Sequence, residues 1–457
     1  MKRTTKKTLL LTAAASAFLL AAPAHAETLT QAMVSAYQTN PGLAAQRAQL
    51  RATDEQASQA ESNWRPRVRG ITSIGKLYTY TPDNALLSPH GGHTPKAMGL
   101  EIVQPIFRGF RTDSAVDSAE KQIDASRALL KAAEQKLLFD VGRTYLDVLR
   151  DQATVALYLH NQDVLTLRQT ETQKRFAIGD ATRTDVLQAQ ARLDGVKTGL
   201  AEAQGKLEND TAAYARYVGH APKDLVEPKL ETEPFKTLDE TVDAAVRNNP
   251  AIIAGEADED KANADIDLSK GTLLPEIDLV GSATRAWDQS DFIPGQQDST
   301  AVMLRMTIPL YNAGEDYSRT REAQQTATAK RMQLDDIRLA VRQSAVGGWN
   351  ALQTARAAIA SSKAQADADA LALEGVKKEA SAGTRTVLDI LNAQQELLAA
   401  KVAYIQAQHD EAVALLRVRA AVGDLTARAL KLPAKLYDPQ KNYDEVKDKL
   451  IGFADAQ

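Results

Sequence analysis

Two spacings of hydrophobic residues alternate along the chain, and each predicts a different kind of element. Around Val302 and Leu304, apolar residues alternate with polar or mixed ones, which is the period of two that is typical of a β-strand. Elsewhere, apolar residues return every three or four positions, as in Val141, Tyr145 and Val148, which indicates helices. Alanine fills many other inner positions, and small inner residues suit the close packing of a coiled coil.

The distribution of proline sets the length of the predicted helices. No proline occurs between Pro105 and Pro222 or between Pro309 and Pro433, so both stretches lack the strongest helix breaker. At a rise of about 1.5 Å per residue, one helix of the first stretch is expected to reach about 100 Å. We predict two strands before each of two helical hairpins, with strands within about 67–106 and 276–310 and hairpins over about 110–219 and 315–423.

The chain carries the same pattern twice. Pro41 returns as Pro250 after 209 residues, each directly behind an asparagine, and Pro105 returns as Pro309 after 204 residues. A unit of about 200 residues is too long for a solenoid repeat of about 20 to 50 residues, so we infer the duplication of a domain-sized element. We divide the mature chain into a first repeat, a second repeat and a tail, over 27–226, 227–432 and 433–457.

The N-terminus predicts export from the cytoplasm. Four basic residues precede an apolar run from Leu9 to Ala22 and an Ala-x-Ala site at 24–26, which is the pattern of a signal peptide over residues 1–26. Removing those four charges changes the formal net charge from −4 to −8, which argues against nucleic acid as a partner. The chain has no cysteine, so packing or association with other chains must stabilise it. Beyond residue 26 no apolar run approaches the roughly 18 residues of a membrane helix, so any part that enters a membrane must consist of strands.

Strands in a membrane impose a further requirement. Four strands cannot close a barrel, since the smallest membrane barrels have about eight, and an open edge in lipid leaves backbone groups unpaired. The chain must therefore form an oligomer. Glu101 and Arg305 occupy equivalent positions on the mixed face of the predicted strands, and we place both in a lumen because charge is unfavourable in lipid. The alternative is a position just below the membrane.

No constellation of residues predicts catalysis. The chain has no cysteine, no serine nucleophile elbow and no glycine-rich phosphate loop, so we expect neither enzyme activity nor a cofactor. His90 and His93 raise the alternative of a metal site, but two histidines in an exposed loop fall short of a usual ligand set. We therefore predict no metal site.

A threonine and an aspartate mark the start of each returning helix. Thr182 precedes Asp185 by three residues, and Thr386 precedes Asp389 by the same distance. This is the spacing of a capping box, in which the hydroxyl and the carboxylate satisfy free backbone N–H groups. The alternative is a role in a channel, where symmetry would gather copies of each acid around one axis and favour a bound cation. The two roles are compatible.

With these features together, the sequence resembles the TolC-type outer-membrane channel family over nearly all of the mature chain, to about residue 435. The most specific segment, 382–394, is similar to the family's second periplasmic turn, and 178–190 is similar to the first. The two Asn-Pro pairs and the segments 105–109 and 309–314 also fit.

The resemblance implies a mainly α protein with a small β part and a duplicated strand-strand-hairpin unit. It implies a homotrimer whose twelve pooled strands form one outer-membrane β-barrel, continued by a twelve-helix periplasmic α-barrel. Such channels are exit ducts of tripartite efflux pumps or type I secretion systems in the outer membrane of Gram-negative bacteria. They contact outer-membrane lipid, work with a periplasmic adaptor and an inner-membrane pump or ABC ATPase, and pass small molecules or unfolded proteins without doing chemistry.

The resemblance also assigns residues to a periplasmic gate. By position, Thr184, Asp185 and Arg385 match members of the polar links that hold the family's closed state. Asp389 matches one acid of a carboxylate pair that attracts cations, but Asn392 stands where the second acid is expected. We therefore expect a weaker cation ring.

Two further features concern the tip. Ala380 stands where the family has a linking tyrosine, so we expect the closed state to be held differently. The turns at Gly179 and Gly383 are the implied contacts for the adaptor.

A periplasmic coiled-coil adaptor or scaffold without a pore is the main alternative, because it would also carry an export signal and a helical hairpin. An adaptor normally has one hairpin between β-rich halves, whereas this chain predicts two, each preceded by strands. The tail, 433–457, is expected to lie in the periplasm, where it either wraps the middle of the helical barrel or remains disordered.

Overall fold

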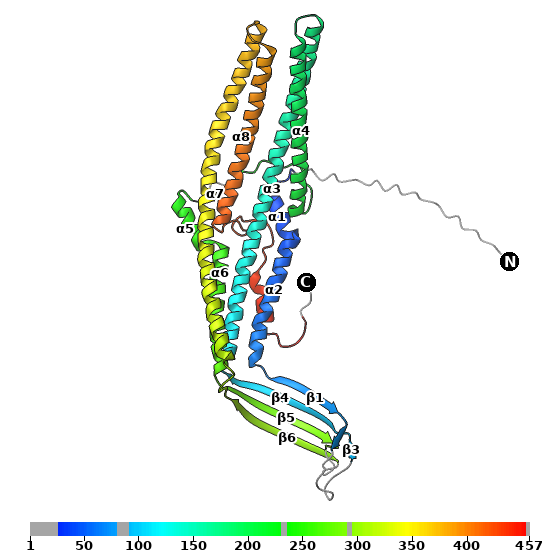
Figure 1. Ribbon diagram of the computed structural model, residues 1–457, viewed down its shortest axis with the longest axis vertical. Coiled ribbons are helices and arrows are strands. Elements are labelled where there is room, and N and C mark those ends of the chain that lie inside the picture. Colours follow the sequence, from blue (N-terminus) through cyan, green and yellow to red (C-terminus); the bar gives the residue numbers. More distant parts are fainter. Residues whose placement is uncertain (1–25, 80–90, 230–234, 290–294, 454–457) are drawn as a thin grey trace, which may run out of the picture.

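The computed structural model describes residues 26–79, 91–229, 235–289 and 295–453, so most of the predicted signal peptide and His90 lie outside the described residues. Figure 1 shows an elongated subunit with a bundle of long helices and, at its lower end, a curved sheet. This mainly helical fold with a small sheet confirms the class predicted from the sequence.

The first repeat is built around one long helix. Its elements are α1 (Leu29–Thr39), α2 (Pro41–Glu61), a 3-10 turn (Ser62–Trp64), β1 (Arg67–Ile74), β2 (Leu77–Thr79), β3 (Gly91–His93), β4 (Lys96–Arg108), α3 (Arg111–Ala177) and α4 (Arg183–Val218). At about 1.5 Å per residue, the 67 residues of α3 span about 100 Å. In Figure 1, α2 covers the lower part of α3 and α4 covers its upper part.

The second repeat has the same plan. Its elements are α5 (Leu238–Asn248), α6 (Pro250–Lys270), a 3-10 turn (Gly271–Leu273), β5 (Glu276–Trp287), β6 (Gln296–Thr307), α7 (Glu315–Ser381) and α8 (Val387–Ala421), and the tail adds α9 (Pro439–Val446). The long helix α7 again has 67 residues. Because α6 packs on both α3 and α7, it joins the two repeats.

The two Asn-Pro pairs mark the N-termini of α2 and α6, the short helices that precede the strands. The sequence analysis did not predict these helices. Asn40 caps α2 by accepting a hydrogen bond from the Gly42 N–H at 2.9 Å, and its Nδ2 donates to the Tyr217 carbonyl near the end of α4 at 3.1 Å. Asn249 caps α6 and donates to the Ala421 carbonyl at the end of α8, at 2.8 Å. Proline suits the first helical position, where an N–H would lack a partner. Each Asn-Pro pair therefore connects the C-terminal end of a returning helix, α4 or α8, to the N-terminus of a short helix, α2 or α6.

The sheet joins the two repeats edge to edge. Its strand order is β1-β4-β5-β6, and every neighbouring pair is antiparallel. The pair β4 and β5 brings together one strand from each repeat. β1 and β6 form the edges, so within the described chain their outer backbone groups have no strand beside them.

The register gathers apolar side chains on one face of the sheet, although the ion pair of Arg285 with Asp298 also lies on this face near the far end of the strands. One face carries Val68, Leu100, Ile102, Leu279, Val302 and Leu304, all of which are exposed in the subunit. On the other face, Arg69 Nη2 donates to Glu101 Oε1 at 2.6 Å, and Asp278 lies opposite Arg305. Glu101 and Arg305 therefore share a face, as the strand pattern predicted.

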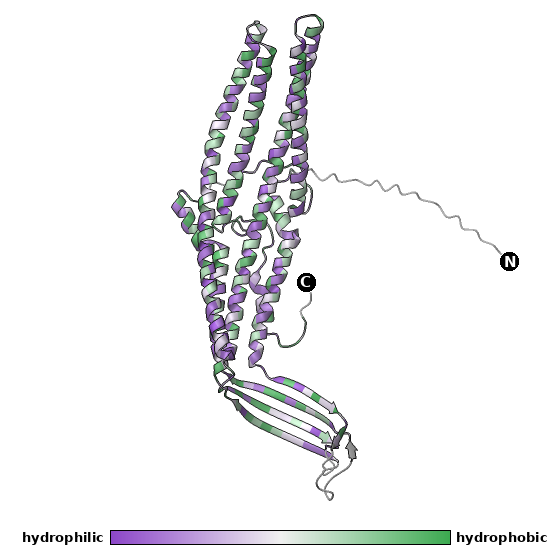
Figure 2. Ribbon diagram, viewed as in Figure 1, coloured by the Kyte–Doolittle hydropathy of each residue, from purple (hydrophilic) through white to green (hydrophobic). Residues whose placement is uncertain are grey.

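The largest hydrophobic core lies where α1, α3, α4 and α8 meet. Tyr145 and Tyr214 are fully buried there, and the hydroxyl of Tyr145 donates to the Val226 carbonyl at 2.6 Å. Gly142 allows α8 to approach α3, because a Cβ at this position would lie 2.5 Å from Cδ1 of Leu416. Figure 2 shows polar and apolar residues intermixed along the long helices.

In the described part of the chain, no helix combines the length and the apolar character that crossing a membrane requires.

The tail is ordered along α2 over its described part. Asn442 of α9 donates to the buried carboxylate of Asp54 at 2.8 Å, and the Tyr437 N–H donates to the hydroxyl of Tyr37 at 3.0 Å. The described part of the tail therefore packs against α1 and α2, and its wrapping around the middle of the helical barrel stays a prediction.

Candidate functional site

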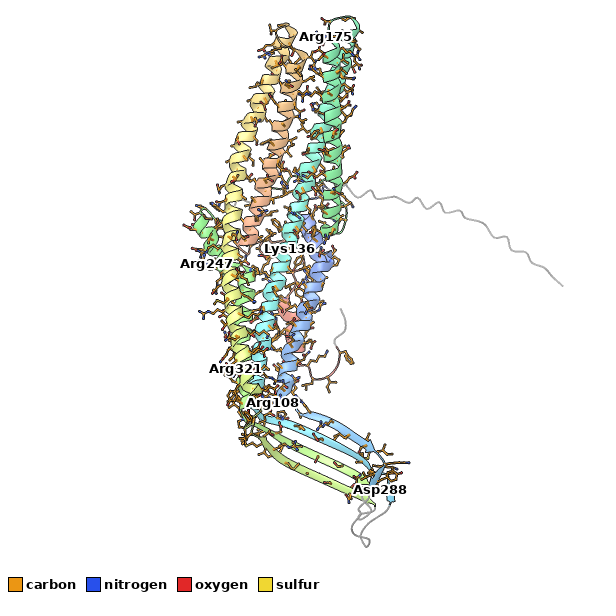
Figure 3. The ribbon with its side chains drawn as sticks, in the orientation of Figure 1. Arg108, Lys136, Arg175, Arg247, Asp288 and Arg321 are labelled. Atoms are coloured by element: carbon orange, nitrogen blue, oxygen red, sulfur yellow. The ribbon has the colours of Figure 1, made fainter. Side chains whose placement is uncertain are left out.

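Both hairpins end in turns of the same design, at the end of the molecule far from the sheet. Figure 3 labels Arg175 at this end, while Asp288 marks the distant end of the strands. Gly179 and Gly383 both have φ 81, a left-handed conformation that glycine adopts without strain. A Cβ at either position would have nothing within 4 Å, so both turns present an open surface.

The predicted capping boxes are present at the start of α4 and α8. The N–H of Thr182 donates to Oδ2 of Asp185 at 2.8 Å, and the N–H of Asp185 donates to the Thr182 hydroxyl at 3.2 Å. The corresponding distances between Thr386 and Asp389 are 2.9 and 3.2 Å. The prediction that each threonine and its aspartate form a capping box is therefore confirmed.

The caps also fix the charge of the two acids. Hydrogen bonds from the backbone N–H and then from the hydroxyl of Thr182 hold the pKa of Asp185 below its usual value. Hydrogen bonds from the backbone N–H and then from the hydroxyl of Thr386 likewise hold the pKa of Asp389 below its usual value, and the charge of Arg385 contributes. Both acids are therefore ionised at neutral pH, and each hairpin presents a fixed negative charge at its tip.

In each turn, one arginine forms an ion pair with an acid of the same turn, Arg175 with Asp180 and Arg385 with Glu379. Arg385 Nε donates to Glu379 Oε2 at 2.9 Å, and both side chains are about half exposed. Thr184 lies exposed in the first turn of α4, in the other hairpin. In the described subunit, Asp185 bonds with Thr182 of its own cap and Arg385 with Glu379 of its own turn, rather than with each other.

A contact between the hairpins, which the sequence analysis missed, involves Asn392. Arg192 Nη2 of α4 donates to Asn392 Oδ1 of α8 at 2.8 Å. Just beyond it, Gln394 Nε2 donates to Oδ1 of the buried Asn161 of α3 at 3.1 Å. Asn392, which stands in place of the family's second acid, therefore accepts a hydrogen bond from a cation. No local motif predicts this pair, because its members lie 200 residues apart. They are also not at equivalent positions of the two repeats, which are offset by 204 residues.

Among the described residues, no group of three or more His, Cys, Asp or Glu side chains is placed to hold a metal ion. His90, from the alternative metal site, falls outside the described residues.

A sheet with one largely apolar face, continued by helical hairpins whose longer helix spans about 100 Å, is the arrangement expected of a subunit of a membrane channel. A family model described as outer membrane efflux protein matches residues 32–220 and 241–424. The chain belongs to this family.

Known relatives agree over almost the whole chain. The outer membrane efflux protein BepC of Brucella suis is 31% identical over 430 residues, which cover 94% of this chain and 92% of that one. The outer membrane protein TolC of Vibrio cholerae is 25% identical over 441 residues, covering 92% and 96%. Among solved structures, the CmeC outer membrane channel of Campylobacter jejuni has a TM-score of 0.79 at 16% identity, covering 92% and 89%.

The protein is therefore an exit duct for efflux or type I secretion in the outer membrane of a Gram-negative bacterium, with its helical part in the periplasm. The family is one of transport channels. This assignment excludes the alternative of an adaptor or scaffold without a pore.

Proposed function

We propose that three copies of the chain assemble edge to edge into one channel that carries small molecules or unfolded proteins from the periplasm to the outside. The open sheet is the observation that carries this proposal, since β1 and β6 both lack a neighbour in the described chain while one face of the sheet is apolar. In lipid, each unpaired backbone group costs several kcal/mol. Pairing β6 of one copy with β1 of the next removes that cost and closes a barrel of twelve strands.

The surface beside β6 supports assembly of this kind. Leu310 and Tyr311, at the foot of α7, are 91% and 82% exposed in the subunit. Apolar side chains this exposed, next to an unpaired strand, are typical of a contact surface. Pairing β6 with β1 is a head-to-tail contact, which generates a closed ring when the rotation between copies permits it.

The helical tip is the part that meets the rest of the machinery. The open turns at Gly179 and Gly383 supply a surface for a periplasmic adaptor, which connects the duct to an inner-membrane pump or ABC ATPase. That partner supplies the energy, so the duct itself catalyses no reaction and needs no cofactor. The hairpins close the tunnel by leaning toward its axis, and their separation opens it.

Reconstitution tests this function directly. The detergent-solubilised protein is expected to have the mass of a trimer and to give discrete single-channel currents in planar bilayers. Variants with a proline in the middle of β1 or β6, at Ile71 or Ala301, are matched to a variant with proline at Lys76, which lies outside the strands between β1 and β2. Loss of currents in the strand variants alone supports barrel closure by these edges. A monomer without currents would contradict the proposal.

Asp389 is proposed to form a cation ring, because threefold symmetry would gather three ionised copies of it around the tunnel axis. Asp389→Asn removes the charge while keeping an oxygen that caps α8. We expect this variant to lose its preference for cations and its block by multivalent cations, with little change in stability. Asp194→Asn removes an exposed carboxylate farther along the first hairpin, outside the residues assigned to the gate, and serves as the matched control. Parent-like selectivity of Asp389→Asn would show that this acid is a helix cap and nothing more.

A further inference from the structure

A buried ion cluster connects the two hairpins near the middle of α3. Its members, called the mid-helix cluster below, are Asp147, Arg150 and Asp151 of α3, Lys206 and Asp210 of α4, and His409 of α8. The guanidinium of Arg150 contacts all three carboxylates, at 2.8 Å from Asp147, 2.7 Å from Asp151 and 3.0 Å from Asp210. The side chains of Arg150 and His409 are both 9% exposed.

His409 is the member that comes from the second hairpin, and both of its ring nitrogens face carboxylates. Nε2 lies 2.8 Å from Asp147 Oδ1, and Nδ1 lies 3.0 Å from Asp410 Oδ1. A neutral imidazole carries one N–H, so it leaves one nitrogen lone pair against a carboxylate, whereas the charged ring donates to both acids. Gln406 Nε2, at 3.4 Å from Nδ1, is a weaker alternative donor. The geometry therefore suits the charged ring.

Charged groups of the neighbouring segments also lie near His409 or near its partner Asp147. Arg150 Nη1 lies 3.4 Å from Nε2 and opposes a charge on the ring, but its own charge is shared among three carboxylates. Arg143 of α3 acts on Asp147 from farther away. Glu227, in the segment after α4, lines a cleft of about 260 Å³ together with Arg150 and His409. The cleft gives solvent protons a route to the ring.

The acids of the mid-helix cluster outnumber its permanent cations. Burial, together with the hydrogen bond to Asp151, raises the pKa of Asp210 to about 6. Burial alone would also raise the pKa of Asp147, but the hydrogen bond from His409 and the charge of Arg150 keep it below its usual value. Asp147 thus remains an ionised partner for His409 across the range in which histidine changes its charge.

We propose that His409 is a positioning residue that ties α8 to α3 through Asp147 and holds the two hairpins together when its ring is charged. The inference rests on the proposed function, because separating hairpins opens a path only in a tunnel built from them. A charged ring donates to both acids and completes the tie, whereas a neutral ring donates to only one of them. A charge on this ring therefore favours the closed tunnel.

Two substitutions fix the charge of this position and provide the test. His409→Lys keeps a cation beside Asp147 at every pH, while His409→Asn keeps a neutral side chain. His160→Asn, on the exposed surface of α3, removes a histidine outside the cluster and is the matched control. The readout is the resting conductance of each protein in planar bilayers between pH 5.5 and 8.

We expect the resting conductance of the parent and of His160→Asn to rise with pH over this range, because histidine side chains lose their charge between about pH 5 and 8. The conductance of His409→Lys should lie below that of His409→Asn, and both should depend less on pH than the parent, with Asp210 responsible for any dependence that remains. A parent-like profile in His409→Asn, or equal profiles in the two His409 variants, would overturn the proposal.

A second readout keeps this test separate from the proposed function. Thermal unfolding of the same proteins in detergent reports the tie without any current. The parent should be stabilised at pH 5.5 relative to His409→Asn, and the difference should shrink at pH 8. If the parent conducts no current, the proposed channel fails, but the unfolding profiles still decide whether His409 forms the tie. Identical pH profiles of unfolding for the parent and His409→Asn would exclude it.

Discussion

Replacing Arg150 by methionine is expected to destabilise the folded subunit by about 3 to 5 kcal/mol, the range found when one partner of a buried ion pair is removed. Methionine fills much of the same space but leaves Asp147, Asp151 and Asp210 without their shared cation. Burial and the hydrogen bond to Asp151 raise the pKa of Asp210 to about 6, so its proton is retained below that pH and lost above it. The loss of stability should therefore be smaller at pH 5 than at pH 8. Urea unfolding in detergent, followed by circular dichroism, measures it.

The matched control is Arg338→Met. Arg338 also pairs with two acids, Glu256 at 3.0 Å and Asp335 at 3.2 Å, but its side chain is 42% exposed. Exposed pairs of this kind contribute about 1 kcal/mol or less. If the two variants lose the same stability, the mid-helix cluster is no more important than a surface pair.

Replacing Gly109 by alanine is expected to cost about 3 kcal/mol, because two unfavourable effects combine there. Gly109 has φ 60, in the left-handed region. A Cβ at this position would also lie 2.5 Å from the carbonyl oxygen of Gly271, a backbone atom that cannot turn aside. This contact lies where the first repeat meets the second, at the junction of strands and helices. Thermal unfolding of the detergent-solubilised protein measures the loss.

Gly314→Ala separates the two effects. Gly314 has φ 83, but a Cβ there would meet nothing within 4 Å, so a loss of about 1 kcal/mol is expected from the backbone conformation alone. Ala313, which occupies the position equivalent to Gly109 in the second repeat, already adopts φ 50. Equal losses at 109 and 314 would show that the approach of Gly271 is unimportant.

The sequence predicted the parts of the fold that depend on local patterns. The alternation around Val302 indicated a strand, and the absence of proline after Pro105 indicated a helix of about 100 Å, as α3 has. The capping boxes at Thr182 and Thr386 were predicted for the same reason, since the spacing of a threonine and an acid over three residues is sufficient to specify them.

The contacts that were missed join residues far apart in the chain. The Asn-Pro pairs served in the sequence analysis only as markers of the repeat. The contact of the Asn40 side chain with the end of α4 joins residues 177 apart, so no local pattern predicts it. Arg192 and Asn392 meet where α4 contacts α8, and the segment that contains Asn392 gives no indication of a partner 200 residues away in the chain. His409 showed no site pattern in the sequence, since Asp147 and Arg150 lie more than 250 residues before it.

The central pairing of β4 with β5 gives a ring of three copies an approximate sixfold symmetry. Each junction within a subunit would resemble the junction between subunits, because both place the second strand of one repeat beside the first strand of the next. The side chains break this likeness, since Gly205 and Thr354 occupy the positions equivalent to His409 and Arg150. In a ring of three copies, contacts that contain the mid-helix cluster would then alternate with contacts that lack its His–Arg pair, and the hairpins would separate more readily at the latter.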